Sequence, residues 1–367
     1  SSDVCSSDLM RPTTESEMAE AVRGAGPFVL RGGGTRFIGI ARGEVLETQG
    51  LSGITLYEPG ALTLVAQAGT PLAEIEAVLK GERQRLAFEV PDMRAILGRE
   101  GVSTIGGVVA ANASGPRRVQ VGACRDALLG LRFVSGRGEV IKNGGRVMKN
   151  VTGYDLAKLM AGSHGTLGVI TEVSFKVQAI PEVEATLIGE GMDAGKAVAA
   201  LTQAMGSPYD PSGAGYMGGA AMIRLEGMAG SVAYRAAALR GQLGGEWRLI
   251  EAAESAALWA DLRDMRRFTG KLGAIWRISV KPSDGPRVVQ TLGGETLLDW
   301  GGGLVWALLP EGQDARAALA GIKGHATLIR GGGFSTFAPE APNLAAIAQA
   351  LRDKFDPLGV LNQGIMG

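Results

Sequence analysis

The sequence predicts an α+β protein of two domains, and three observations lead to this prediction. Apolar runs with the period-two alternation of strands lie between amphipathic stretches typical of helices. The pattern changes near residue 182, after which strand-like and helix-like segments interleave. The chain has 367 residues, of which 46% are hydrophobic, so it can bury the cores of two domains.

The first domain is expected to span residues 10–181. Its elements in chain order are a helix at 13–26, strands at 27–30 and 63–68, a helix at 70–80, a hairpin of strands 131–134 and 139–141, a short helix at 154–161 and a strand at 169–177. Pro71 is expected in the first position of the second helix, where proline is favoured. Gly162 stands where the short helix would end.

The second domain is expected to span residues 182–340. Its expected strands are 185–189, 222–226, 276–281, 304–309 and 327–330, and its expected helices are 195–205, 232–242, 251–268 and 314–323. This interleaving predicts an antiparallel sheet with helices on one face, a ferredoxin-like cap. Residues 341–367 are expected to form an amphipathic helix at 344–355 and a tail, packed back on the first domain.

Three glycine-rich segments indicate where a ligand could bind. The loop Arg31-Gly32-Gly33-Gly34-Thr35 follows a buried strand, and its row of amides suits a phosphate, with Arg31 or Arg36 adding charge. In residues 101–115 nearly every side chain is small, so a large ligand can lie against the backbone. Residues 149–173 combine a short helix, a turn with Gly165 and Gly168, and a buried strand. Any one segment alone is most simply an ordinary turn, whereas three together favour a binding site.

The usual nucleotide-binding loops do not fit this sequence. Phe37 stands where a Rossmann loop beginning at Gly32 would need glycine, and no GxxxxGK[ST] loop occurs. Residues 213–218 formally match GxGxxG, but they follow Ser-Pro-Tyr-Asp-Pro-Ser, whereas the motif needs a preceding strand. We therefore interpret residues 213–218 as a loop unrelated to nucleotide binding.

The three segments, in this order, resemble the FAD-binding domain of the vanillyl-alcohol-oxidase type, also called the PCMH type. The segment Thr104 to Gly115 is similar to the family's T-I-G-G-x-x-A-x-N-x-x-G, and Gly153 to Glu172 is similar to its last block. Gly122, Arg125 and Asp126 match its G-x-x-R-D, and the likeness covers roughly residues 20–180. Within this family the chain is similar to the FAD-binding subunits of bacterial glycolate oxidases, through residues 276–280 and the tail 355–362. Gln363 stands where the family has proline.

The resemblance implies a PCMH-type FAD-binding domain of two α+β subdomains and a ferredoxin-like cap that closes over the flavin. The cofactor-binding residues it implies are Arg31, Gly32, Gly33, Gly34, Thr35, Arg36, Thr104, Ile105, Gly106, Gly107, Ala111, Asn112, Gly115, Gly165, Gly168, Val169, Ile170 and Asn362. Some members bind FAD through a histidine in or near the first glycine loop. Because this loop has no histidine, non-covalent FAD is expected.

Oxidation of a 2-hydroxy acid needs a base for the hydroxyl proton and a cation for the carboxylate, besides FAD. Single-chain relatives look as if they use a histidine base and a histidine-rich metal site, but this chain has only His164 and His325, so no metal site is expected. The resemblance then implies an electron-transfer or accessory flavin subunit of a glycolate oxidase complex, with a catalytic flavin subunit and an iron–sulfur subunit as partners.

Two alternatives stay open. In a stand-alone FAD-dependent 2-hydroxy-acid dehydrogenase, Arg277 or Arg330 would hold the carboxylate and Tyr154 or His164 would act as base. The simpler interpretation of each arginine is a strand residue facing solvent. In a structural scaffold, the chain would have lost its flavin, although the intact glycine segments argue against this.

Charge and cysteine content indicate the setting. Lysine plus arginine and aspartate plus glutamate number 37 each, so no overall field attracts nucleic acid or a membrane surface. The two cysteines are too few for an iron–sulfur cluster, and Cys124 is expected to be a packing residue. Residues 1–9, which include Cys5, are interpreted as extraneous sequence before Met10. The expected location is the cytoplasm, where partner subunits could bring the chain to the inner face of the membrane.

Overall fold

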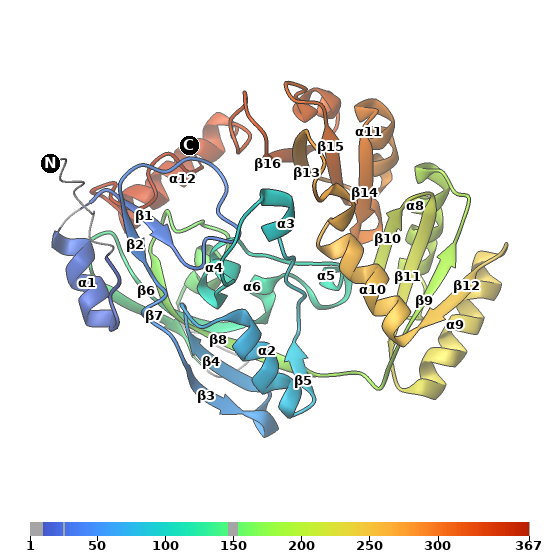
Figure 1. Cartoon of the computed structure of the whole chain (residues 1–367), viewed down its shortest axis with the longest axis horizontal. Helices are drawn as coiled ribbons and strands as arrows, with labels where there is room; N and C mark the ends of the chain where they lie inside the picture. Colours follow the sequence, from blue (N-terminus) through green and yellow to red (C-terminus); the bar gives the residue numbers. More distant parts are fainter. Residues whose placement is uncertain (1–9, 25, 146–152, 367) are drawn as a thin grey trace, which may run out of the picture.

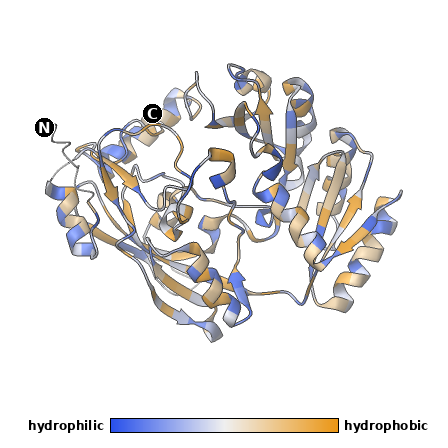
Figure 2. Cartoon of the chain, viewed as in Figure 1, coloured by the Kyte–Doolittle hydropathy of each residue, from blue (hydrophilic) through white to orange (hydrophobic). Residues whose placement is uncertain are grey.

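The computed structural model describes residues 10–24, 26–145 and 153–366, which form two lobes, each built on its own large sheet (Figure 1). Residues 1–9, and residues 149–152 of the third glycine-rich segment, lie outside the described residues. Figure 2 shows hydrophobic residues along the strands of both sheets and hydrophilic residues over the outer helices. Within the described residues, none of the helices has the length and apolar character that crossing a bilayer requires.

The first lobe contains a parallel strand pair and a larger antiparallel sheet, which confirms the predicted α+β class. The pair is β1 (Phe28–Arg31) with β2 (Glu44–Glu47). The sheet has the order β3-β4-β8-β6-β7, with β5 beside β8. Its strands are β3 (Ile54–Glu58), β4 (Thr63–Gln67), β5 (Gln84–Leu86), β6 (Leu128–Val134), β7 (Val140–Gly144) and β8 (Val169–Ala179). The helices are α1 (Glu15–Gly24), α2 (Leu72–Gly81), α3 (Arg94–Leu97), α4 (Ile105–Ala110), α5 (Arg118–Val121), α6 (Cys124–Ala127) and α7 (Leu156–Met160).

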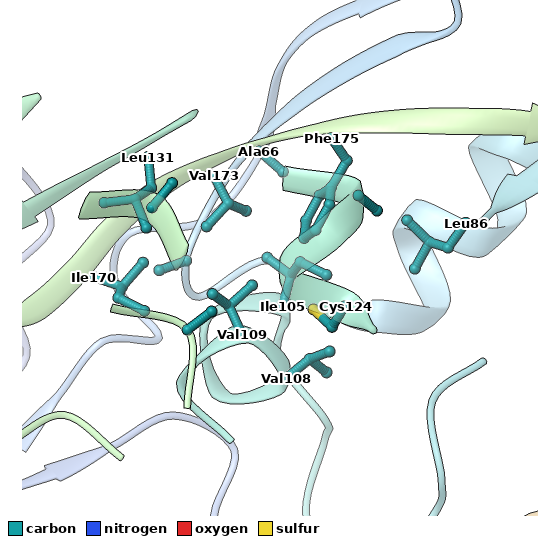
Figure 3. Packing of buried hydrophobic residues seen from close by; sticks show 14 of the residues in the cluster. Ala66, Leu86, Ile105, Val108, Val109, Cys124, Leu131, Ile170, Val173 and Phe175 are labelled. Carbon is teal, nitrogen blue, oxygen red and sulfur yellow. The ribbon is translucent and has the colours of Figure 1, made fainter. Parts of the chain in front are cut away.

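The core of the first lobe lies between β8 and helix α4 (Figure 3). Val173 and Phe175 of β8 face Ile105 and Val109 of α4, and all four are fully buried. Cys124 packs in the same cluster, and burial raises the pKa of its thiol. The thiolate is therefore disfavoured, and Cys124 is an unreactive packing residue.

The second lobe is one eight-stranded sheet in the order β12-β9-β11-β10-β14-β15-β13-β16. Its strands are β9 (Val183–Gly189), β10 (Gly213–Met217), β11 (Ala220–Gly227), β12 (Arg248–Glu251), β13 (Ala274–Val280), β14 (Glu295–Asp299), β15 (Leu304–Leu309) and β16 (Gly324–Arg330). Its helices are α8 (Ala194–Met205), α9 (Ala229–Leu243), α10 (Ala252–Arg263) and α11 (Gly285–Leu292). Each half repeats the βαββ pattern of a ferredoxin-like unit, and the halves join where β10 pairs with β14. The cap thus contains two ferredoxin-like units side by side.

The two faces of the cap sheet have different neighbours. Helices α8 and α9 cover one face of the first half, and α11 covers the same face of the second half. On the opposite face, Trp259 of α10 packs with Ile275 and Trp306 of the sheet and with Ile38 and Ile96 of the first lobe. This face is therefore turned toward the first lobe.

Several elements differ from the sequence-based expectations. The predicted loop at 213–218 is wrong over Gly213–Met217, which is strand β10, because Gly213 and Gly215 leave room for the side chains of Trp259 and Leu262. The helix expected at 251–268 ends at Arg263, before a turn and the short 3₁₀ helix Arg266–Phe268. The helix expected at 314–323 is the 3₁₀ segment Ala315–Leu319. Strands β2, β3, β5, β12 and β14 were not predicted from the sequence.

A buried ion-pair network joins the lobes. Arg224 of β11 donates to Glu89 of the first lobe at 2.8 and 3.0 Å. Arg117 of the first lobe donates to Glu226 of β11 at 3.0 Å twice, and Arg85 donates to the same carboxylate at 2.6 Å. Both carboxylates are thus paired with arginines from both sides, as buried charges require. The predicted boundary at 181/182 stays a prediction, and it falls between β8 and β9, which belong to different sheets.

The C-terminal helix α12 (Pro342–Phe355) lies against the first lobe (Figure 1). Its Leu351 and Phe355 pack on the core of that lobe, and the Phe355 ring centroid is 6.0 Å from that of Phe133. The tail then runs beside β1, where the Asn362 N–H donates to the Phe28 carbonyl at 2.9 Å.

Candidate functional site: a pocket between glycine-rich segments

The pocket lies where the loop after β1, the segment entering α4 and the turn before β8 meet. It encloses about 740 Å³ of space, a volume that includes open solvent at its mouth. Its lining residues are Leu30, Arg31, Gly32, Gly33, Gly34, Thr35, Arg36, Phe37, Thr48, Thr104, Gly106, Gly107, Ala110, Ala111, His164, Gly165, Gly168, Val169, Ile170 and Asn362.

The glycine loop is packed so tightly that side chains are excluded. A Cβ on Gly33 would lie 1.5 Å from the Val102 carbonyl oxygen, and one on Gly32 would lie 2.4 Å from Thr104 Oγ1. The loop carbonyls are occupied, because Gln49 donates to that of Gly32 at 3.0 Å and Arg99 donates to that of Gly34 at 3.2 Å. Hydrogen bonds from Gln49 and Arg99, which lie far apart in the sequence, therefore fix the conformation of the loop.

The loop leaves hydrogen-bond donors available to a ligand. Among the described residues, the N–H groups of Gly33, Gly34 and Thr35 have no hydrogen-bond acceptor. The Thr104 hydroxyl lines the same pocket, is buried, and has no described partner either. Unsatisfied buried polar groups are rare in folded proteins, so these donors fit a group rich in acceptor oxygens, such as a pyrophosphate.

The two arginines of the loop differ in their partners. Arg31 donates to Glu47 at 2.5 Å, so a carboxylate already balances its charge. Arg36 is buried and donates to Ser103 Oγ at 2.7 Å, while its Nε has no described partner. Burial lowers the pKa of Arg36 to about 10, which leaves it charged near neutral pH. Among the described residues, Arg36 is therefore a cation of the loop with no carboxylate as hydrogen-bond partner.

Asn362 of the tail ties the pocket walls together. Its Oδ1 accepts from the Leu30 N–H at 2.8 Å, and its Nδ2 donates to the His164 carbonyl at 2.7 Å. Gly165 must be glycine here, because a Cβ would lie 2.8 Å from that amide nitrogen at a φ of +75°. Gln363, which replaces the expected proline, keeps its backbone carbonyl as acceptor for the Arg42 N–H at 3.2 Å.

His164 forms part of the wall at the turn before β8. Its ring lies edge-on to Phe337, with the centroids 5.2 Å apart. Burial, and secondarily the charge of Arg277, lower the pKa of His164 to about 4. The imidazole is thus neutral near pH 7.

Three residues implied by the resemblance lie outside the pocket. The Ile105 side chain is fully buried in the core. The Asn112 Oδ1 accepts from the Arg125 N–H at 3.0 Å, so it shapes the α4–α6 connection. The Gly115 carbonyl accepts from Trp300 Nε1 of the cap at 3.1 Å, which places it at the contact between the lobes. The pocket also includes Leu30, Phe37, Thr48 and Ala110, which carry no recognisable motif of their own.

The four weak catalytic candidates are separated by the fold. Tyr154 is 88% exposed and is not part of the pocket lining. Arg330 donates to the carbonyls of Ile96, Lys271 and Gly273 at 2.6 to 3.3 Å. Because Ile96 belongs to the first lobe, Arg330 links the two lobes by hydrogen bonds. Arg277 does not face open solvent, because it is half-buried on the cap face turned toward the first lobe. Only His164 lines the pocket.

In the part of the chain that the structure describes, no group of three or more histidine, cysteine, aspartate or glutamate side chains could hold a metal ion.

Comparisons with known proteins show the family to which this chain belongs. Residues 8–144 match the family described as FAD binding domain. The chain is 39% identical to the glycolate oxidase subunit GlcE of Escherichia coli strain K12 over 355 residues, which is 95% of each chain. It is 34% identical to the glycolate oxidase subunit GlcD of Bacillus subtilis strain 168 over 174 residues, 46% of this chain and 36% of GlcD.

Among solved structures, alkyldihydroxyacetonephosphate synthase matches with a TM-score of 0.68 at 16% identity, over 96% of this chain and 76% of its own. This likeness shows the fold. Together with the domain match, the residues of the pocket fit FAD, which is the cofactor of this family.

Proposed function

Because the chain belongs to the family of the glycolate oxidase subunit GlcE, we propose that it is the non-covalent FAD-binding subunit of a complex that oxidises glycolate to glyoxylate. The pocket carries this proposal. Thr104, whose hydroxyl has no described partner, and residues 33–35, whose N–H groups have no described acceptor, line one cavity, which suits a dinucleotide phosphate.

When bound, FAD would supply the redox chemistry, since a flavin can accept electrons and pass them on. The chain's own residues position and shield the cofactor. Gly32 and Gly33 keep the loop free of side chains, and Asn362 fixes β1 against the turn at residues 164–165. His164 and Phe37 add less polar walls, and the neutral imidazole brings no charge into the pocket near pH 7.

The proposed role is electron transfer or accessory flavin binding. Tyr154 is exposed and Arg330 is engaged by backbone carbonyls, so neither is placed to act on a substrate in this pocket. The described residues contain no metal-binding group. Catalysis is therefore assigned to a second flavin subunit, and an iron–sulfur subunit is proposed to carry electrons onward.

One observation favours a second candidate, a stand-alone FAD-dependent 2-hydroxy-acid dehydrogenase. The charge of Arg277 is the second cause, after burial, of the lowered pKa of His164, and Arg277 lies on the cap face turned toward the first lobe, where it could serve as the cation for a carboxylate. A flavin-free scaffold has no such support, because the glycine loop keeps its free donors.

Expression of the chain alone and together with both proposed partners distinguishes these roles. Glycolate-dependent reduction of an artificial dye should be fast in the complex and slow in the isolated chain, although both contain FAD. The Gly33→Ala chain, assembled with the same partners, should give a complex depleted of one flavin. Glycolate turnover by the isolated chain at the rate of the complex would establish the stand-alone dehydrogenase instead.

A further inference from the structure

The C-terminal helix α12 is poorly covered by the rest of the chain and lies at the edge of the molecule (Figure 1). Among the described helices of eight or more residues, it alone has no buried residue. Leu351 and Phe355 are half-buried against the first lobe, but Leu344 is 53% exposed and Ile347 is 59% exposed. Exposed apolar side chains that gather in one place mark interaction surfaces.

A groove lies beside α12 and encloses about 1210 Å³ of space, a volume that includes open solvent at its mouth. The helix contributes Ala345, Ala348 and Arg352, which share one helix face at the i, i+3 and i+7 positions. Residues 334–340, which lead from β16 to α12, and Ile40, which is 80% exposed, contribute further lining. We call this surface, together with the exposed apolar side chains of α12 beside it, the α12 groove.

The α12 groove is largely apolar and nearly free of charge. Its apolar lining includes Phe334 and Phe337. Glu340 and Arg352 are the ionisable side chains of its described lining, and Arg352 donates to the Met366 carbonyl. Charged side chains are depleted at the centres of protein interfaces, and the interfaces of permanent subunits are more hydrophobic than those of transient partners. The groove therefore suits a permanent subunit and not a diffusing charged molecule.

The α12 groove adjoins the FAD pocket. Phe337 lines the groove and packs edge-on against His164, which lines the pocket, with the ring centroids 5.2 Å apart. The loop after β1 also reaches both, since Phe37 lines the pocket and Ile40 lines the groove. A subunit seated in the groove would therefore lie beside the cofactor site, as direct electron exchange between two flavins requires.

The kinship of the chain indicates what kind of protein covers the groove. The chain belongs to the family of the glycolate oxidase subunit GlcE and is also related in sequence to GlcD, another glycolate oxidase subunit. A subunit of a complex needs at least one surface that a partner buries. Exposed Ala346 and Ala350, one turn apart on α12, let a partner helix approach closely.

We propose that the second flavin subunit of the complex docks on α12 and seats an apolar segment in the α12 groove. Electrons leave the substrate on that subunit, so its flavin is the one that must lie nearest to the FAD of this chain. The proposal excludes the iron–sulfur subunit and a second copy of this chain as occupants. The inference rests on the proposed function, because that function supplies the partner.

Binding of the second flavin subunit to the FAD-loaded chain, measured by biolayer interferometry, tests this surface. Ile347→Glu and Ala345→Arg each bring an unpaired charge into the contact, so each should weaken binding at least about 30-fold. Tyr234→Glu, which replaces an exposed side chain of α9, is the matched control and should bind as the wild type does. Because the contact is apolar, the affinity of the wild type should change by less than about threefold between about 0.1 M and about 1 M NaCl.

The FAD content and the melting temperature of each variant show whether the fold and the cofactor site are intact, which separates lost docking from misfolding. The inference is overturned if both folded variants bind the second flavin subunit within about threefold of the wild type, or if the wild type does not bind that subunit. It is also overturned if the variants lose the iron–sulfur subunit instead, or if the isolated wild-type chain forms a dimer that Ile347→Glu disperses. The proposed function fails separately, if the wild-type complex assembles but does not oxidise glycolate.

Discussion

Replacement of Gly33 by alanine is expected to abolish tight FAD binding while the protein stays folded. The new Cβ would lie 1.5 Å from the Val102 carbonyl oxygen and 2.5 Å from its carbon. Both are backbone atoms, so no side-chain rotation relieves the clash. Since real Cβ contacts are essentially never below 3.0 Å, the loop and residue 102 must separate by roughly 1.5 Å.

A displacement of this size breaks hydrogen bonds from the loop amides, which hold only over a range of about 0.5 Å. Each bond to a charged phosphate is worth about 1.5 to 3 kcal/mol. Loss of two such bonds therefore weakens FAD binding by about 10²- to 10⁴-fold.

Calorimetric titration of the FAD-free protein with FAD measures this loss. Gly81→Ala in α2 is the matched control, because its Cβ meets no atom within 4 Å. Circular dichroism shows whether each variant is folded. A folded Gly33→Ala protein that binds FAD within about threefold of the wild type would refute the assignment of this loop.

Three further predictions concern the charges at the lobe contact. Arg224→Met should lower the free energy of unfolding by about 3 to 5 kcal/mol, because it leaves Glu89 buried without this partner. Exposed Arg248→Met should leave the free energy of unfolding nearly unchanged. Urea denaturation measures both, and equal losses would contradict the buried network. Burial opposes ionisation of Glu89, but Arg224 and Arg117 outweigh it and lower its pKa to about 2. Its stabilising contribution is therefore complete above its ordinary pKa of 4.5 and is lost as the pH falls toward 2. Unfolding titrations at several pH values should show this loss, and a Glu89→Gln variant with an unchanged acid slope would disprove the cause. Burial raises the pKa of Asp299 to about 7, so its contribution falls as the pH rises from its ordinary 3.8 through 7. Asp299→Asn should therefore gain stability relative to the wild type at about pH 8 but not at about pH 4, and an equal difference at both pH values would contradict the shift.

The local signals in the sequence located most of the pocket. Residues 31–35 and the turn at 165–168 follow or precede strands that alternate clearly, so their positions were predictable. The resemblance, and not periodicity, supplied the long-range pairing of these segments with Asn362.

What the sequence could not show depends on contacts between distant residues. Glycine is poor in strands, so Gly213–Met217 looked like a loop, although Trp259 and Leu262 fill the space beside its glycines. Ile105 belongs to a glycine-rich motif, but its side chain turns into the core. The Arg277 environment depends on Trp300 and Arg118, which lie 23 positions later and 159 positions earlier in the sequence.

The flavin content of the purified chain is the decisive measurement for cofactor binding. We expect about one FAD per chain, with the yellow chromophore released completely into the supernatant when the protein is precipitated with acid. A chain that is colourless as purified, and that takes up no FAD when it is supplied, would show that the pocket does not bind FAD.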